Sequence, residues 1–210
     1  MNQHLYLCGI CCVGKSTVLH ELSQEYDIQP EYTDYFEHSL QNPEFKSKHQ
    51  DPEVQIIYTI NQVLKSTISI PKIFDRSPIS DLLYSLVFEE KAKLEAGKNK
   101  LEAMLEWELF RSTCEKYKTL YILIDDDDKG AEDDILQKMK NRNNGLDVLD
   151  RDYITAQRTI FSTISQHIPS YEALIKPKHL KIHTDQYYAW LKNGVLNYMK
   201  ENQFIKAKQQ

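Results

Sequence analysis

One short segment, Gly-Ile-Cys-Cys-Val-Gly-Lys-Ser-Thr at residues 9–17, constrains this chain more than any other part of the sequence. It matches the pattern G-x-x-x-x-G-K-[ST], which forms a phosphate-binding loop between a β-strand and an α-helix. Glycines let the backbone curl so that successive N–H groups face a polyphosphate. Lys15 is expected to reach the β- and γ-phosphates, and the Ser16 hydroxyl to bind Mg²⁺. The helix that begins here adds its dipole at the same point, so the segment predicts a site for a nucleoside triphosphate.

Both flanks of this segment agree with a strand, a loop and a helix. Residues 4–8 form a short apolar run before the loop. Residues 17–22 place apolar side chains at helical spacing after it. The residues expected to bind the triphosphate are Gly9, Cys11, Cys12, Val13, Gly14, Lys15, Ser16 and Thr17.

The bulk properties are those of an ordinary globular protein. Of the 210 residues, 41% are hydrophobic and 27% are charged, which predicts one domain over residues 1–205 with a full core. We find no apolar stretch of membrane-spanning length and no signal peptide pattern, so we expect no membrane partner and a cytoplasmic location. A net charge of −5 argues against a dedicated nucleic-acid partner, which usually requires a basic face.

The cysteines raise the question of a metal site. Cys8, Cys11 and Cys12 form a C-x-x-C-C pattern. A structural zinc site needs a second pair of ligands at suitable spacing, and the sequence shows none, so we do not predict zinc. Two of these cysteines lie inside the phosphate loop, where a helix N-terminus lowers thiol pKa and can make them sensitive to oxidation.

Predicted strands and helices alternate along the chain. This order indicates an α/β fold of the P-loop kinase-like type, a three-layer sandwich in which helices flank a five-stranded parallel sheet. We expect strands at about residues 4–9, 27–31, 71–75, 119–124 and 179–183. We expect helices from the phosphate loop to about residue 26, from residue 51, from residue 77, over residues 98–117, and over a last segment that contains Trp190, Leu191, Val195 and Tyr198.

Polar residues follow several of the predicted strands, at the sheet edge where open α/β folds bind ligands. These residues are Glu31, Asp75 with Arg76 and Ser77, and Asp125. Asp75 ends an apolar strand, which suits a metal or a water ligand, so it is a candidate Mg²⁺ ligand with Ser16 and a candidate substrate contact. Arg76 offers a planar fork for phosphate oxygens. The alternative is that Asp75 only starts the next helix and that Arg76 is its ion-pair partner.

Two stretches resemble a known family. Residues 74–81, Phe-Asp-Arg-Ser-Pro-Ile-Ser-Asp, are similar to the E/D-R-S-x-x-S-D segment of deoxynucleoside kinases. Residues 29–32, Gln-Pro-Glu-Tyr, resemble the Pro-Glu that carries the catalytic carboxylate in that family, and Glu31 follows Lys15 by 16 positions, close to the family's short spacing. The resemblance implies an ATP-dependent kinase that uses Mg²⁺ and phosphorylates a nucleoside or a nucleoside monophosphate.

The resemblance also implies roles for individual residues. Glu31 becomes the general base that takes a proton from the attacking sugar hydroxyl. Arg76 steadies the charge of the substrate or of the transferred phosphoryl group, and Asp81 helps to hold the sugar. Gln55 falls where the family places its base-recognising glutamine, although a polar residue on a solvated helix face is an equally good interpretation.

A lid is expected at residues 138–158. Arg142, Arg151 and Arg158 surround an Asn-Asn-Gly turn there, as in the arginine-bearing lid of thymidylate and deoxynucleoside kinases. Lid arginines stabilise the charge that spreads over the phosphoryl group. Arg142 is the first candidate because it precedes the glycine, and Arg151 is the second. The alternative is an ordinary solvated helix–turn–helix.

The chain departs from the family pattern at three places. Its phosphate loop lacks the acidic or glycine-rich lead-in of typical thymidylate kinases. Leu82 stands where deoxynucleoside kinases place an arginine, which affects sugar recognition. An acidic run at residues 125–128 has no counterpart that we recognise; a solvated loop is the favoured interpretation, and a bias toward metal binding is the other.

Several alternative functions stay open. Residues 30–32 and 75–78 also resemble P-loop kinases of the nicotinamide riboside type. A non-catalytic module that binds ATP for regulation is a second alternative. A polynucleotide end kinase is disfavoured by the net negative charge. Many nucleoside kinases of this shape are dimers, so a homodimer is the family expectation, and the predicted helix at residues 98–117 can serve as core or as interface.

Overall fold

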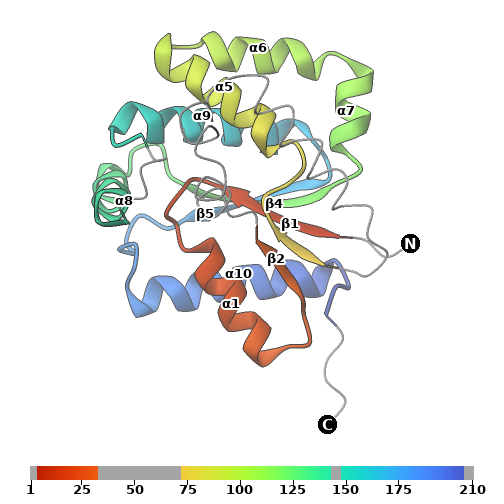
Figure 1. Cartoon of the computed structure of the whole chain (residues 1–210), viewed down its shortest axis with the longest axis vertical. Helices are drawn as coiled ribbons and strands as arrows, with labels where there is room; N and C mark the ends of the chain where they lie inside the picture. Colours follow the sequence, from red (N-terminus) through yellow and green to blue (C-terminus); the bar gives the residue numbers. More distant parts are fainter. Residues whose placement is uncertain (1–3, 33–71, 143–147, 206–210) are drawn as a thin grey trace, which may run out of the picture.

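The computed structural model describes residues 4–32, 72–142 and 148–205, and these residues form one parallel sheet with helices on both faces (Figure 1). The sheet has five strands in the order β2-β3-β1-β4-β5. The strands are β1 (Leu5–Gly9), β2 (Pro30–Tyr32), β3 (Ile73–Asp75), β4 (Lys118–Ile124) and β5 (Tyr171–Lys176). The predicted P-loop kinase-like α/β architecture is confirmed.

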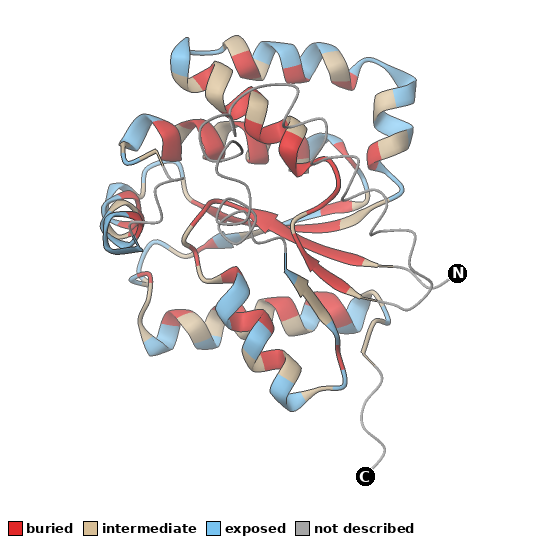
Figure 2. Cartoon of the chain, viewed as in Figure 1, coloured by how far each residue is buried: buried red, intermediate tan, exposed pale blue. Residues whose placement is uncertain are grey.

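Helices form the two outer layers. Figure 1 shows α1 (Lys15–Glu25) and α10 (Asp185–Glu201) on one face of the sheet, with α5 (Ser80–Ala92), α6 (Ala96–Leu105) and α9 (Arg151–His167) on the other. The two remaining helices of the described part are α7 (Glu108–Cys114) and α8 (Lys129–Arg142). Buried residues gather where these layers meet (Figure 2).

The central strand β1 sets the position of the candidate site. It pairs with β3 on one side and with β4 on the other, and the register places Leu7 beside Asp75. The Arg76 backbone N–H then donates to the Leu7 carbonyl over 3.0 Å. Because parallel strands end at the same edge of the sheet, Asp75 and Arg76 emerge next to the loop that follows β1.

The predicted strand at residues 179–183 is wrong, since the fifth strand is Tyr171–Lys176. This edge strand pairs only with β4 among the described strands, and four of its six side chains are not buried, so it lacks the burial on both faces that an inner parallel strand has. Pro177 directly follows β5, and the Leu180 N–H donates back to the Pro177 carbonyl in a turn. Ile182, one of the two apolar residues of the predicted strand, is buried within this irregular connection.

The single helix predicted at residues 98–117 is two helices. Helix α6 ends at Leu105, Trp107 has extended dihedral angles (φ −80°, ψ 119°), and α7 starts at Glu108. The spacing of Leu101, Leu105 and Leu109 suggested one continuous apolar stripe. Leu101 and Leu105 are buried, but the break at Trp107 turns the chain, so Leu109 is 80% exposed.

Two other boundaries shift by a few residues. The second strand covers residues 30–32, where residues 27–31 were predicted. Helix α5 begins at Ser80, not at Ser77, because the Ser77 N–H bonds the Ser80 hydroxyl and the Ser80 N–H bonds the Ser77 carbonyl in a turn. The helix predicted from residue 51, with Gln55, lies outside the described residues. None of the described helices has the length and apolar character needed to cross a bilayer.

Candidate active site

The loop between β1 and α1 has the backbone curl that its sequence predicts. Gly9 has φ +115°, and a Cβ there would lie 2.2 Å from the Ile122 carbonyl oxygen of β4. Cys12 and Gly14 are also left-handed, with φ of 56° and 86°. Left-handed residues that follow right-handed ones can form concavities of backbone N–H groups that bind anions, and this loop has the left-handed positions that such a site requires. Helix α1 starts directly behind it, at Lys15.

Lys15 lies over this loop and is buried. Its ammonium donates to the Ile10 carbonyl over 2.7 Å and to the Gly9 carbonyl over 3.3 Å. Burial lowers the pKa of the Lys15 ammonium from its usual value, and the nearby Asp75 carboxylate opposes that shift. The structure therefore places a cation, its carboxylate neighbour and the loop within one small site.

Ser16 and Asp75 meet at the mouth of this loop. The Ser16 hydroxyl donates a hydrogen bond to one carboxylate oxygen of Asp75. Asp75 is 8% exposed, and its other oxygen has no hydrogen-bond partner among the residues that the structure describes. A buried carboxylate oxygen without a partner is costly, and hard cations such as Mg²⁺ prefer carboxylate and hydroxyl oxygens. The two residues expected to bind Mg²⁺ are thus adjacent, and they fit that ion.

Arg76 follows Asp75 in an unusual conformation. It has φ of 92°, a left-handed value that is uncommon for a residue with a side chain. Its guanidinium carbon lies 4.7 Å from the centre of the Tyr84 ring, a cation–π contact with helix α5. Residues held in such sparsely populated conformations cluster at functional sites. The strained turn directs Arg76 away from the strand and toward α5.

Glu31 lies on β2, and the register places it beside Phe74. Its carboxylate pairs with the Lys72 ammonium over 2.8 Å, and its side chain is 29% exposed. Because successive side chains of a strand point to opposite faces, Glu31 lies on the face opposite to Asp75. The structure thus brings Asp75 to the phosphate loop, whereas Glu31 is directed to Lys72.

Asp81 is a buried carboxyl group in the first turn of α5. The residue is 1% exposed, and one carboxyl oxygen has no hydrogen-bond partner within the described ranges. Burial raises the pKa of Asp81 to about 8. Near neutral pH the group is therefore mostly protonated, and a protonated carboxyl can donate as well as accept a hydrogen bond. This property suits a contact to a polar acceptor.

The three arginines of the predicted lid differ in their surroundings. Arg142 is the exposed last residue of α8, and residues 143–147 lie outside the described part. Arg151, at the start of α9, forms an ion pair with Asp133 of α8. Arg158 is largely buried and pairs with Glu132 over 2.7 Å and with Asp126 over 3.1 Å. Arg158 thus joins α9 to the start of α8.

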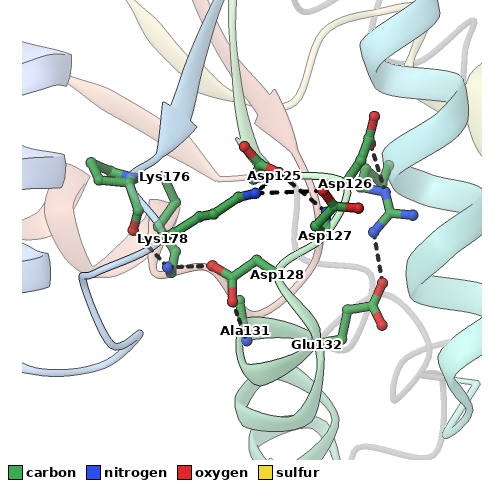
Figure 3. Close-up of polar contacts among 10 residues, drawn as sticks. Asp125, Asp126, Asp127, Asp128, Ala131, Glu132, Lys176 and Lys178 are labelled. Carbon is green, nitrogen blue, oxygen red and sulfur yellow. Dashed lines mark hydrogen bonds and ion pairs between the residues drawn. The ribbon is translucent and has the colours of Figure 1, made fainter.

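The acidic run at residues 125–128 was predicted to be a solvated loop. That prediction is wrong for Asp128, which forms a largely buried ion pair. Asp128 pairs with Lys176 over 2.6 Å, and the side chains of the two residues are only 11% and 2% exposed (Figure 3). Asp128 also accepts a hydrogen bond from the Ala131 N–H, which caps α8. Asp125 and Asp127 pair with the exposed Lys178. The run therefore fixes the start of α8 to the end of β5.

Two residues that were not predicted from the sequence form hydrogen bonds with the backbone of the phosphate loop. The Gln157 amide of α9 accepts a hydrogen bond from the Cys11 N–H, and the Tyr187 hydroxyl of α10 donates to the Val13 carbonyl over 2.7 Å. Both side chains are fully buried. A signal for Gln157 was present, because it interrupts the apolar stripe of α9 that contains Ile154.

The four cysteines are free, and no three metal-ligating side chains gather in the described part of the chain. Cys8 accepts a hydrogen bond from the Ser77 N–H over 3.0 Å. Cys12 is partly exposed, whereas Cys8, Cys11 and Cys114 are buried.

By class, this is the fold of P-loop deoxynucleoside kinases. Solved structures of deoxyadenosine kinase from M. mycoides align with it. The dATP complex has a TM-score of 0.60 at 14% identity and covers 92% of this chain and 100% of that chain. The complex with products dCMP and dCDP has a TM-score of 0.60 at 12% identity, covering 93% and 99%. The dCTP complex has a TM-score of 0.55 at 14% identity, covering 93% and 100%.

Sequence comparison finds a viral relative. An uncharacterised 33.9 kDa protein of Lymantria dispar multicapsid nuclear polyhedrosis virus is 26% identical over 169 residues, which include 79% of this chain. The aligned segment spans 55% of the length of that relative. No family model matches the chain.

Proposed function

We propose that this protein is an ATP-dependent kinase that transfers a phosphoryl group to a (deoxy)nucleoside or a nucleoside monophosphate. The observation that carries the proposal is the hydrogen bond between Ser16 and the buried Asp75 carboxylate, beside the buried Lys15. A nucleotide-binding loop alone would serve a switch or a motor equally well. The fold of deoxyadenosine kinases supports a small-molecule kinase in particular.

The donor half of the site consists of the loop, Lys15, Ser16 and Asp75. Loop N–H groups bind the phosphates, and Lys15 leaves the Gly9 and Ile10 carbonyls for the β- and γ-phosphate oxygens. Such exchange is favoured because phosphate oxygens are charged acceptors, whereas carbonyls are neutral. Ser16 and Asp75 hold Mg²⁺, which supplies charge neutralisation across the phosphate oxygens when it is bound.

The acceptor half consists of Glu31, Arg76 and Asp81. Glu31 takes the proton of the attacking hydroxyl while that oxygen bonds to the γ-phosphorus and ADP departs. For this step the Glu31 carboxylate leaves its ion pair with Lys72 and accepts a hydrogen bond from the hydroxyl. The Glu31 side chain is partly exposed, so the acceptor can reach it. Arg76 binds developing negative charge, and Asp81 contacts the acceptor. Gln55 is proposed as a contact to the base.

The lid completes the proposed site over residues 138–158. Arg142 and Arg151 move to the transferred phosphoryl group when the lid closes. Arg151 must leave Asp133, and that pair is exposed on both sides. Exposed ion pairs contribute only about 0–1 kcal/mol, so the exchange for a phosphate costs little.

A substrate panel tests the proposal. ADP release is measured by a coupled assay with ATP, Mg²⁺ and a series of nucleosides and nucleotides, and the product is identified by mass spectrometry. We expect turnover with at least one acceptor, and a loss of about 10²–10³ in kcat for Lys15→Ala. Lys116→Ala, at an exposed turn before β4, is the matched control and should retain activity.

Other outcomes identify the alternatives. Tight ATP binding without ADP release for any acceptor would overturn the kinase and support a regulatory module. Phosphorylation of nicotinamide riboside alone would assign the other kinase type. Thermal stability provides a second readout, because a true acceptor as well as ATP should raise the melting temperature.

A further inference from the structure

Cys11 lies in the phosphate loop, two residues after Gly9, and the side chains of Gln157 and Met139 contact it. Its backbone N–H donates to the Gln157 amide oxygen over 2.9 Å. Its thiol receives a hydrogen bond from the Gln157 amide nitrogen over 3.3 Å and lies 3.6 Å from the Met139 sulfur. Gln157 belongs to α9 and Met139 to α8, and both side chains are fully buried.

The orientation of the Gln157 amide follows from its partners. A backbone N–H can only donate, so the amide oxygen must face Cys11. The amide nitrogen then faces the Cys11 sulfur and also the Tyr153 carbonyl, 3.4 Å away. Both ends of the amide are used, so this fully buried polar group has partners that balance the cost of its burial.

This arrangement constrains the loop where its curl begins. The Cys11 N–H donates to Gln157, so this contact fixes the shape of the loop. Cys12, Gly14 and Lys15 follow and supply the concavity and the cation. A change of direction at Cys11 would displace all of them, and oriented N–H donors lose strength steeply when misaligned.

We propose that Gln157 is a positioning residue that fixes the phosphate loop at Cys11 and so ties the loop to α9. The inference deepens the proposed function, because it assumes that the loop binds ATP. Gln157 itself contacts neither the nucleotide nor the acceptor; it acts through the Cys11 backbone.

The test replaces Gln157 with a side chain of similar length that cannot form these bonds. In Gln157→Met, iodoacetamide should alkylate Cys11 about tenfold faster than in the wild type, as read by tandem mass spectrometry that separates Cys11 from Cys12. The Kd for ATP should rise about tenfold, because the variant leaves the Cys11 N–H without its buried partner. The KM for ATP should rise with it, while the KM for the acceptor stays within about twofold.

Gln166→Met is the matched control. Gln166 lies on the same helix and is exposed. Its amide nitrogen donates a hydrogen bond to the Ser162 hydroxyl on the same helix. It should leave Cys11 alkylation and ATP binding unchanged. Equal effects from the two substitutions, or wild-type alkylation and ATP binding in a folded Gln157→Met protein, would overturn the proposal.

A second variant covers the case in which Gln157→Met does not fold. Gln157→Glu keeps an oxygen acceptor for the Cys11 N–H, so its alkylation rate should stay within about threefold of the wild type. Alkylation raised about tenfold in Gln157→Glu would refute the anchoring role. Alkylation requires no turnover, so a wild-type protein that binds no ATP would refute the proposed function while the alkylation comparison still decides the anchor.

Discussion

The buried carboxyl group of Asp81 makes stability depend on pH in a direction opposite to that of most carboxylates. Asp81 is 1% exposed, and burial raises its pKa to about 8. In the unfolded chain an aspartate has a pKa of about 3.9. Between these values the folded protein holds a proton that the unfolded chain releases. The contribution to stability is therefore fully present below about pH 4 and is lost as the pH rises through about 8.

The magnitude follows from the proton difference. One proton changes the free energy of unfolding by about 1.4 kcal/mol per pH unit. From about pH 6 to pH 8 the free energy of unfolding of the wild type should fall by about 2 kcal/mol because of Asp81. The fall is slightly smaller than that expected for one proton over two pH units, because Asp81 begins to ionise in the folded protein near its own pKa. Asp81→Asn has a similar shape and no titratable group, so it should escape this loss.

Urea unfolding of the wild type and of Asp81→Asn at several pH values measures the effect. We expect the stability advantage of Asp81→Asn over the wild type to grow by about 2 kcal/mol from about pH 6 to pH 8. Asp185→Asn, at an exposed first-turn aspartate of α10, controls for removal of a helix-terminal carboxylate. Parallel stability curves for the wild type and Asp81→Asn would refute the argument that burial holds Asp81 protonated.

Two further predictions concern the acidic run and the phosphate loop. Asp128→Asn keeps the helix cap but leaves the buried Lys176 ammonium without its carboxylate, so it should destabilise by about 3–5 kcal/mol in urea unfolding. Asp127→Asn, at an 86% exposed side chain, should cost under about 0.5 kcal/mol, and equal losses would contradict the role of burial. Gly9→Ala places a Cβ 2.2 Å from the Ile122 carbonyl oxygen at a left-handed φ. It should destabilise by about 1–3 kcal/mol and weaken ATP binding, and wild-type values for both would contradict the close approach.

The features predicted correctly are those that local chemistry specifies. The turn and the helix start at residues 9–17 depend on residues within that segment, so its backbone structure could be predicted from the local sequence. The buried strand at Lys118–Ile124 shows a continuous apolar run, which few other structures produce. Asp75 does lie at the end of an apolar strand beside the loop, as its position in the sequence indicated, and its binding role stays a prediction.

The features missed depend on partners far away in the sequence. The edge strand Tyr171–Lys176 leaves most of its side chains unburied, and its place in the sheet depends on pairing with β4. The break at Trp107 reflects the route back to β4, which helical periodicity does not encode. The functional pairing of Glu31 remains a prediction, because the structure directs it to Lys72.

The sequence by itself determined the strand–loop–helix segment at residues 9–17, the parallel α/β architecture, and the acidic and basic residues at the strand ends. It could do so because turns, caps and apolar periodicity act over a few residues. Only the tertiary structure decided which side chains contact one another. Asp75 contacts Ser16, Lys176 contacts Asp128, and Gln157 contacts Cys11, which is 146 positions away. Burial is a property of the whole fold, and burial makes these contacts specific.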